Sequence, residues 1–402
     1  MSPTPRGERL IIALLGRRNA GKSSLINALV GQEIAIVSEV PGTTTDPVDK
    51  HYELLPLGPV TFYDTAGVDD AGELGEKRVA ATRKILYRAD IVIFVNDGSA
   101  YDAHELEMLA RVQEMEIPLL MVFNKADLGE VNPQNIEYCS LRQLPFVKLS
   151  AKDKSGILDA KNELIRLAPK HMSENRVLLG DLLKPKATVI LVCPIDSAAP
   201  KGRLILPQVQ AIRDILDYDA ISIVIKETEL LDTLAMLKNP PDLVVTDSQA
   251  IEQVNRETPE GIEVTTFSIL FARYKGELDI LLTGIEQIDR LQDGDKILIA
   301  EACSHHVQKD DIGRVKLPKW ISNFTGKELI YETYAGHDFP DDLEDYALCV
   351  HCGACMINVA EMNRRIVECH RRGVPITNYG LTICKVLGSF ERAIAPLLRV
   401  KA

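Results

Sequence analysis

The sequence lacks several features that would place the protein in common functional classes. No apolar run reaches the roughly 18 residues that a membrane-spanning helix needs, so we expect no membrane contact. Acidic residues outnumber basic ones, and the formal net charge of −12 argues against broad nucleic-acid binding, which requires Lys and Arg to neutralise phosphates. His-rich tracts, internal repeats and low-complexity segments are also absent, and the first residues predict no secretory signal.

The eight cysteines, without an export signal, favour metal binding or reduced thiols over disulfides, and we expect a cytoplasmic protein. The 402 residues are too many for one ordinary core. Strand-like apolar runs alternate with helical patterns, which indicates an α/β fold. We predict a doubly wound, mostly parallel sheet in residues 1–170, a small α/β domain in residues 171–265 and a second α/β domain in residues 266–402.

The third predicted domain has the weakest periodic signals. A strand near residue 262, a helix over 278–291 and a strand over 296–300 are expected, whereas the stretch after Asp310 is polar and shows few periodic signals. We expect a helix to begin in the Cys349–Cys355 cluster and to run towards Arg371, and the Gly373–Gly380 segment to be a turn.

A phosphate-binding loop follows the first strand-like run. Gly16 to Ser23 reads Gly-Arg-Arg-Asn-Ala-Gly-Lys-Ser, which fits G-x-x-x-x-G-K-S before an apolar helix. Backbone amides of such a loop surround phosphate oxygens, Lys22 adds a positive charge, and the Ser23 hydroxyl is placed for Mg²⁺.

Three further motifs follow in the order that a guanine-nucleotide site requires. Asp64 to Gly67 can hold the metal and sense a γ-phosphate, and Asn124 to Asp127 ends another strand. Asp127 can accept the two donors on the edge of guanine, which adenine lacks, and Ser150 to Lys152 completes the base site. The four motifs together predict GTP binding. The predicted contacts are Gly16, Arg17, Asn19, Ala20, Gly21, Lys22, Ser23, Ser24, Thr43, Thr44, Asp64, Gly67, Asn124, Lys125, Asp127, Ser150, Ala151 and Lys152.

The sequence of the loop, together with Pro-Gly-Thr-Thr-Thr-Asp at 41–46, resembles that of the TrmE-Era-EngA group of GTPases. The resemblance implies that Thr44 closes over Mg²⁺ with Ser23, and that Asn19 can ligate K⁺ beside the phosphates. A side chain at Asn19 that only caps the loop is the alternative. Val68 stands where Ras-like proteins orient water with Gln, so we expect slow hydrolysis. Hydrolysis is assigned to Lys22, Thr44, Asp64 and Gly67.

Cysteine and histidine gather in two short motifs near the C-terminus. Cys-Ser-His begins at Cys303, and His-Cys-Gly-Ala-Cys ends at Cys355. Three readings remain open from the residues: a structural zinc with three thiolates and one imidazole, a 4Fe-4S cluster, or unligated thiols. A cluster on Cys303, Cys352 and Cys355 would leave one iron for His305 or His351. Cys349 is an alternate ligand or, more simply, a core thiol.

The two cysteine motifs behind such a GTPase domain resemble the HydF family of FeFe-hydrogenase maturation GTPases. The resemblance implies a scaffold that carries a 4Fe-4S cluster on Cys303, Cys352 and Cys355, with His305 or His351 as candidate fourth ligand. It also implies a di-iron precursor as cargo, radical-SAM maturases and apo FeFe-hydrogenase as partners, and a homodimer formed by the middle domain. The expected cofactors are GTP, Mg²⁺, the cluster and K⁺.

Two other functions are weighed against this one. An RNA-linked GTPase of the Era or TrmE type with a structural zinc domain would need a basic face, which the acidic composition disfavours. A GTPase that handles nickel or cobalt would be expected to carry His-rich tracts.

Overall fold

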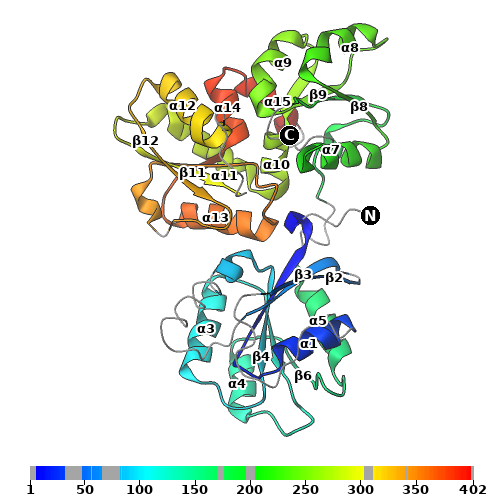
Figure 1. Cartoon of the computed structure of the whole chain (residues 1–402), viewed down its shortest axis with the longest axis vertical. Coiled ribbons are helices and arrows are strands. Elements are labelled where there is room, and N and C mark those ends of the chain that lie inside the picture. Colours follow the sequence, from blue (N-terminus) through cyan, green and yellow to red (C-terminus); the bar gives the residue numbers. More distant parts are fainter. Residues whose placement is uncertain are drawn as a thin grey trace. The chain divides into compact units, whose positions relative to one another are not determined.

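The structure, a computed structural model, divides into two compact units, Met1–Asn175 and Arg176–Ala402 (Figure 1). It describes residues 6–31, 48–55, 57–65, 82, 84–169, 176–195, 204–302, 311–340 and 342–399. Among the described helices, none is both long and apolar enough to cross a membrane.

The first unit is built round a six-stranded sheet in the order β2-β3-β1-β4-β5-β6. β2 runs antiparallel to β3, and every other neighbouring pair of this sheet is parallel. The strands are β1 (Leu10–Leu15), β2 (Val48–Leu54), β3 (Gly58–Asp64), β4 (Ile91–Asn96), β5 (Leu119–Phe123) and β6 (Phe146–Lys148). The helices are α1 (Lys22–Val30), α3 (Ala103–Glu114), α4 (Pro133–Leu141) and α5 (Ile157–Leu167).

The central strand β1 has a buried core on each face of the sheet. Leu10, Ile12 and Leu14 belong to a cluster that includes residues of α1 and α5. Ile11 and Ala13 point to the other face, into a cluster that includes residues of α3 and α4. Helices therefore cover both faces of a mostly parallel sheet (Figure 1), which confirms the doubly wound fold expected for this part of the chain.

The second unit contains two four-stranded sheets, ordered β10-β9-β7-β8 and β12-β11-β13-β14, and all their neighbouring pairs are parallel. The strands are β7 (Thr188–Val192), β8 (Ile221–Ile225), β9 (Leu243–Thr246), β10 (Glu263–Thr266), β11 (Lys296–Glu301), β12 (Ile330–Ala335), β13 (Leu348–His351) and β14 (Ile376–Asn378).

Nine α-helices of the described residues belong to the same unit. They are α7 (Leu206–Asp217), α8 (Leu230–Met236), α9 (Ile251–Glu257), α10 (Phe267–Lys275), α11 (Leu278–Ile285), α12 (Leu317–Thr325), α13 (Val359–Arg371), α14 (Tyr379–Val386) and, at the C-terminal end, α15 (Phe390–Arg399). Short 3₁₀ helices lie at Arg6–Glu8, Gly180–Leu182, Glu227–Glu229, Ser248–Ala250, Glu286–Arg290 and Leu343–Asp345, and a π-helical turn lies at Ile312–Lys316.

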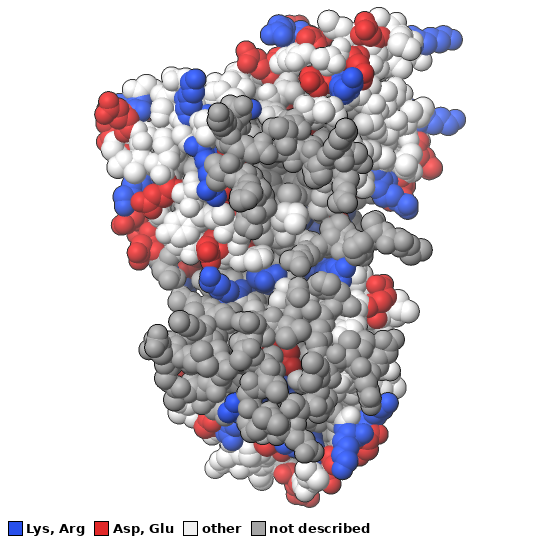
Figure 2. Space-filling view, viewed as in Figure 1, with Lys and Arg blue, Asp and Glu red and all other residues white. Residues whose placement is uncertain are grey.

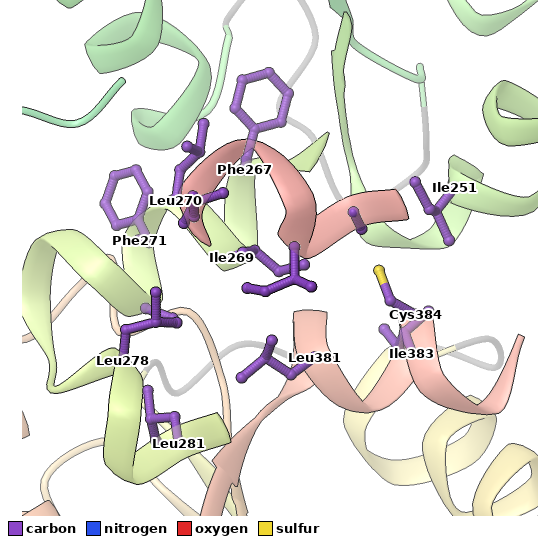
Figure 3. Close-up of a cluster of buried hydrophobic side chains, with 14 of the residues drawn as sticks. Ile251, Phe267, Ile269, Leu270, Phe271, Leu278, Leu281, Leu381, Ile383 and Cys384 are labelled. Atoms are coloured by element: carbon purple, nitrogen blue, oxygen red, sulfur yellow. The ribbon is translucent and has the colours of Figure 1, made fainter. Parts of the chain in front are cut away.

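One hydrophobic core joins the two sheets of the second unit. Figure 3 shows its centre, where Ile269 of α10 lies on the side of Leu381 of α14. Helix α10 directly follows strand β10, so its buried side chains connect the first of the two sheets to the second. The expected dimerisation domain and cluster domain therefore lie within one compact unit.

The surface carries charges of both signs. Figure 2 shows acidic and basic side chains interspersed over the described part of the visible face. Several of them form local pairs in the second unit, such as Arg372 with Glu368 at 2.7 Å and Lys385 with Asp289 at 2.6 Å.

Several elements of the last 140 residues differ from expectation. The segment Leu348–His351 is a strand and α13 begins only at Val359, so the prediction that a helix begins within Cys349–Cys355 is wrong, whereas its predicted extent to Arg371 is confirmed. All four residues of this strand are buried, and a short, fully buried run does not distinguish a strand from a helix. Ile376–Asn378 is also a strand and not part of a turn, because its three residues pair with β13. The polar stretch after Asp310 contains α12 and the half-buried edge strand β12.

Candidate functional site

The loop between β1 and α1 is closely packed at its two glycines. Gly16 has a φ of 136°, and a Cβ there would lie 2.0 Å from the carbonyl oxygen of Val95. Gly21 has a φ of 95°, and a Cβ there would lie 2.1 Å from Nδ2 of Asn124. Only glycine fits both the backbone conformation and the space at these two positions. The spacing of the motif therefore follows from the close approach of neighbouring strands.

Lys22 holds its ammonium group against the loop that precedes it. Its Nζ donates to the carbonyl oxygens of Gly16 and Arg17, both at 2.9 Å, and the side chain is buried. Lys22 is also the first residue of α1, whose first backbone amides have no partner within the helix. The ammonium and these amides together form a concave donor surface suited to phosphate oxygens.

Ser23 and Asp64, which are predicted to hold Mg²⁺, contact each other directly. The Ser23 hydroxyl donates to Oδ2 of Asp64. Strands β1 and β3 are parallel neighbours with Leu14 opposite Asp64, so the carboxylate emerges beside the start of α1. A hydroxyl and a carboxylate oxygen are the hard ligands that Mg²⁺ prefers, directly or through water.

Asn124 ties three of the predicted motifs together. Its Nδ2 donates to the carbonyl oxygen of Ala20 at 2.9 Å, and its Oδ1 accepts from the backbone amide of Ala151 at 3.0 Å. The phosphate loop, the Asn124 segment and the Ser150 segment are therefore held side by side at the carboxyl edge of the sheet. Asp127 is exposed beside them, Ser150 is buried, and Lys125 lies 3.8 Å from Asp97.

Arg17 forms an anchor that the sequence did not reveal. Its Nη2 lies 2.6 Å from Oε2 of Glu105, and its Nε lies 3.0 Å from Oδ2 of Asp102. Glu105 is 0% exposed, so burial raises the pKa of its carboxyl, while a hydrogen bond from the Asp102 amide and the charge of Arg17 oppose that rise. Asp-x-x-Glu before an apolar pattern signals the capping box of α3, but it gives no sign of a contact with the phosphate loop. Asn19 is exposed with a φ of 60°, and Ser24 is half-buried.

Some predicted residues lie outside the described part of the chain. They are Thr43, Thr44, Gly67, Cys303 and His305.

The two cysteine motifs approach one edge of the last sheet. β11 and β13 are parallel neighbours with Ala300 opposite His351, so the residues that follow both strands lie at the same edge of the sheet. The backbone amide of Ala302 donates to Sγ of Cys352 at 3.0 Å, and the amide of Cys352 donates to the carbonyl oxygen of Ala300 at 2.8 Å. Cys303 is the residue after Ala302 in the sequence. The sheet topology thus places Ala302, the residue before the Cys303 motif, in contact with the thiol of Cys352 in the second motif.

The loop from Cys352 to Cys355 is compact and partly shielded. Both cysteines are half-buried, and Ala354 between them has a left-handed φ of 56°. Burial raises the pKa of Cys355, and the positive charge of Lys275 opposes the rise. Asn358 caps α13 three residues later by accepting from the amide of Glu361.

His351 is engaged by protein on both ring nitrogens. It is 0% exposed, its Nδ1 lies 2.9 Å from the carbonyl oxygen of Cys352, and Nη1 of Arg365 lies 3.0 Å from its Nε2. Because a guanidinium only donates, Nε2 accepts and Nδ1 carries the proton of a neutral ring. Burial, together with the charge of Arg365, lowers the pKa of His351 to about 3. Arg365 in turn pairs with the buried Glu361 at 2.8 Å, and Glu361 lies 3.0 Å from His337.

The donor set fits part of a metal or cluster site. Cys352 and Cys355 offer two thiols at chelating spacing, and the amide bonded to Cys352 is of the kind that stabilises a ligating thiolate. Within the described residues, no group of three or more His, Cys, Asp or Glu side chains is placed to hold a metal ion. Cys349 faces the core beside Cys369, and burial raises its pKa, as expected of a packing thiol. Cys139, Cys193 and Cys384 are likewise buried.

Three family models match successive parts of the chain. Residues 11–125 match a model described as 50S ribosome-binding GTPase. Residues 178–276 match the hydrogen maturase F dimerization domain, and residues 279–396 match the hydrogen maturase F tetramerization domain. The last two models come from one family, and together they span more than half of the chain.

Curated relatives resemble the first unit. The tRNA modification GTPase MnmE of Prochlorococcus marinus (strain NATL1A) is 41% identical over 161 residues, which are 39% of this chain and 34% of that protein. The GTPase Der of Kosmotoga olearia is 34% identical over 181 residues, 42% of this chain and 41% of that protein. The chain thus spans well under half the length of these relatives. A crystal structure of Era from Aquifex aeolicus bound to GDP·AlF₄⁻ has 16% identity and a TM-score of 0.37, and covers 57% of this chain and 98% of its own.

Proposed function

We propose that this chain, which belongs to the hydrogen maturase F family, is a GTP-hydrolysing scaffold that binds a 4Fe-4S cluster and delivers a di-iron precursor to an apo FeFe-hydrogenase. The cargo arrives from radical-SAM maturases in this proposal. The observation that carries the cluster half is the hydrogen bond from the Ala302 amide to the Cys352 thiol. It supports a site in which Cys303, the residue after Ala302, joins Cys352 and Cys355.

The nucleotide half of the proposal rests on the contacts of the first unit. Lys22 exchanges its loop carbonyl partners for the β- and γ-phosphates of GTP, and Ser23 and Asp64 hold Mg²⁺ with Thr44. Asp127 selects guanine, and Asn124 keeps its loop against the phosphate loop. Asn19 is the K⁺ ligand, and Gly67 senses the γ-phosphate. Hydrolysis is slow because Val68 cannot orient water. It governs the association of the chain with its partners.

The bound cluster would supply one iron that can exchange its ligand. Three thiolates leave the fourth iron to a weaker group, and a neutral imidazole is displaced more easily than a fourth thiolate. Of the two candidate imidazoles, His305 is favoured over His351. Both ring nitrogens of His351 already bind protein groups, so ligation by His351 would break the bond to Arg365 or to the Cys352 carbonyl.

The matches to dimerization and tetramerization domain models support self-association of the chain, and strand β8 is the proposed contact of a homodimer. β8 ends its sheet, pairing only with β7 among the described strands, and such an edge offers free backbone groups to another strand. Ile221 is 52% exposed and Val224 is 42% exposed on this strand. A second copy of β8, related by a two-fold axis, would pair with the first and cover these side chains.

Anaerobic reconstitution tests the proposal. The full chain is purified without oxygen, incubated with iron and sulfide, and assayed for iron, sulfide and zinc beside its visible and EPR spectra. About four irons per chain are expected, and Cys352→Ser should reduce that content and alter the EPR signal. Zinc without iron would instead favour the RNA-linked GTPase with a structural zinc.

Three variants test the separate parts of the proposal. Lys22→Ala should abolish GTP hydrolysis and leave the iron content unchanged, because Lys22 and the cluster loop belong to different compact units. His351→Gln should preserve the EPR signal, whereas His305→Ala should change it. An iron content that falls with Lys22→Ala would contradict independent sites.

A further inference from the structure

A buried lysine connects α10 to the loop that carries Cys352 and Cys355. Lys275 is the last residue of α10 and is 1% exposed. Its Nζ donates to the carbonyl oxygens of Ala354 at 3.1 Å, Cys355 at 3.3 Å and Ile357 at 2.9 Å. One ammonium therefore binds three carbonyl oxygens of a four-residue stretch that lies about 80 residues further along the sequence.

This arrangement stabilises a backbone conformation that alanine rarely adopts. Ala354 has a φ of 56°, in the left-handed region that side chains with a Cβ disfavour, and its carbonyl is one of the three acceptors. Hydrogen bonds from a charged donor are stronger than neutral ones, and they are strongest where water is excluded. The ammonium thus opposes the tendency of Ala354 to relax into an ordinary conformation.

We propose that Lys275 is a positioning residue for the cluster site: its ammonium holds the Cys352–Cys355 loop in the ligating conformation and places a fixed positive charge behind the thiolates. The proposal rests on the proposed function, since it requires a cluster on this loop. The ammonium of Lys275 donates to three main-chain oxygens, so it acts through the loop and through its charge.

The charge has a consequence that a purely structural lysine would not share. A cluster bound by thiolates becomes more negative when it accepts an electron, and a nearby buried cation favours that reduced form. Replacing Lys275 by an uncharged residue should therefore shift the midpoint potential of the cluster to more negative values. Loop order and potential are two separate readouts of one side chain.

The first experiment uses the metal-free full chain. Hydrogen exchange followed by mass spectrometry should show at least tenfold faster exchange in peptides covering 352–358 of Lys275→Met than in the native chain. The matched control is Leu281→Ala, which removes a buried side chain of the same core at a position outside residues 352–358. It should weaken the unit and leave the local exchange of the loop unchanged.

The second experiment uses the reconstituted chain. Lys275→Met should lose at least half of its iron, and Lys275→Met combined with Ala354→Gly should recover part of it, because glycine adopts a left-handed φ without the cost of a Cβ. The recovered cluster should keep the more negative potential, since the charge is still missing. This rescue separates geometry from charge.

Three results would overturn the proposal. They are unchanged exchange of the loop in Lys275→Met, equal acceleration in Leu281→Ala, or a native midpoint potential in a Lys275→Met protein that holds its full iron content. If the native chain itself takes up no cluster, the proposed function fails, and the exchange comparison still decides whether Lys275 orders the loop.

Discussion

Replacing Arg365 by Met should destabilise the second unit more than any surface substitution. Arg365 is almost fully buried, donates to Glu361 at 2.8 Å and to the carbonyl oxygen of Gly336 at 2.8 Å, and lies 3.0 Å from Nε2 of His351. Met fills a similar volume but satisfies none of these groups. Removing one partner of a buried ion pair leaves an uncompensated charge and costs about 3–5 kcal/mol of the free energy of unfolding.

The sole tryptophan makes this loss measurable. Trp320 is half-buried in α12, so its fluorescence during urea unfolding reports on the second unit alone. The control is Lys385→Met, which breaks a partly exposed pair with Asp289 and should cost no more than about 1 kcal/mol. Both free energies of unfolding come from the same urea titration.

A double-mutant cycle identifies the cause. Glu361→Gln removes the carboxylate charge that loses its guanidinium partner in Arg365→Met, so the double variant should be more stable than the sum of the two single losses predicts, by about 1 kcal/mol or more. A loss below about 1 kcal/mol for Arg365→Met, or additive losses in the cycle, would refute the view that this buried pair holds the network behind His351.

Three further predictions concern other parts of the chain. Gly21→Ala should weaken binding of a fluorescent GTP analogue at least tenfold, because its Cβ would collide with Asn124, whereas Gly31→Ala, with an open surrounding, should retain binding. Val224→Lys should shift the chain towards monomers in sedimentation velocity if β8 is the dimer contact, and an unchanged distribution would exclude that edge. At pH 8, iodoacetamide should label Cys352 of the metal-free chain and leave Cys384 unlabelled in peptide mapping, because burial raises the pKa of Cys384 to about 12.

The first unit was predicted well from the sequence because local backbone geometry fixes the residue types and spacing of its motifs. Gly16 and Gly21 are required by local backbone angles and by close approach of a neighbouring strand, so their spacing is visible in a single sequence. The motifs at Gly16 and Asn124 also follow strands that are buried on both faces, β1 and β5, and such strands appear as continuous apolar runs. The link from Arg17 to Glu105 was missed, since no local pattern connects residues that meet only after folding.

The second unit was predicted less completely, for the same physical reason. Cys349 and His351 lie on a strand of four buried residues, which is too short to show whether its period is that of a strand or a helix. The engagement of His351 by Arg365 depends on packing of α13 against β13, and a list of histidines near cysteines cannot reveal it. Lys275 ends an apolar helix far from either cysteine motif, and nothing in its neighbours indicates three carbonyl partners.

Both candidate sites use a lysine ammonium to order a loop at the carboxyl edge of a parallel sheet, but the two lysines differ in what they can exchange. Lys22 belongs to the loop that it holds, and its two carbonyl partners can be replaced by phosphate oxygens when a nucleotide arrives. Lys275 comes from a separate helix and is 1% exposed, so its ammonium is shielded from solvent where it holds its three carbonyl partners. The first arrangement suits a site that fills and empties with each cycle of hydrolysis. The second suits a site that keeps its shape while its cargo changes, which is what a carrier requires.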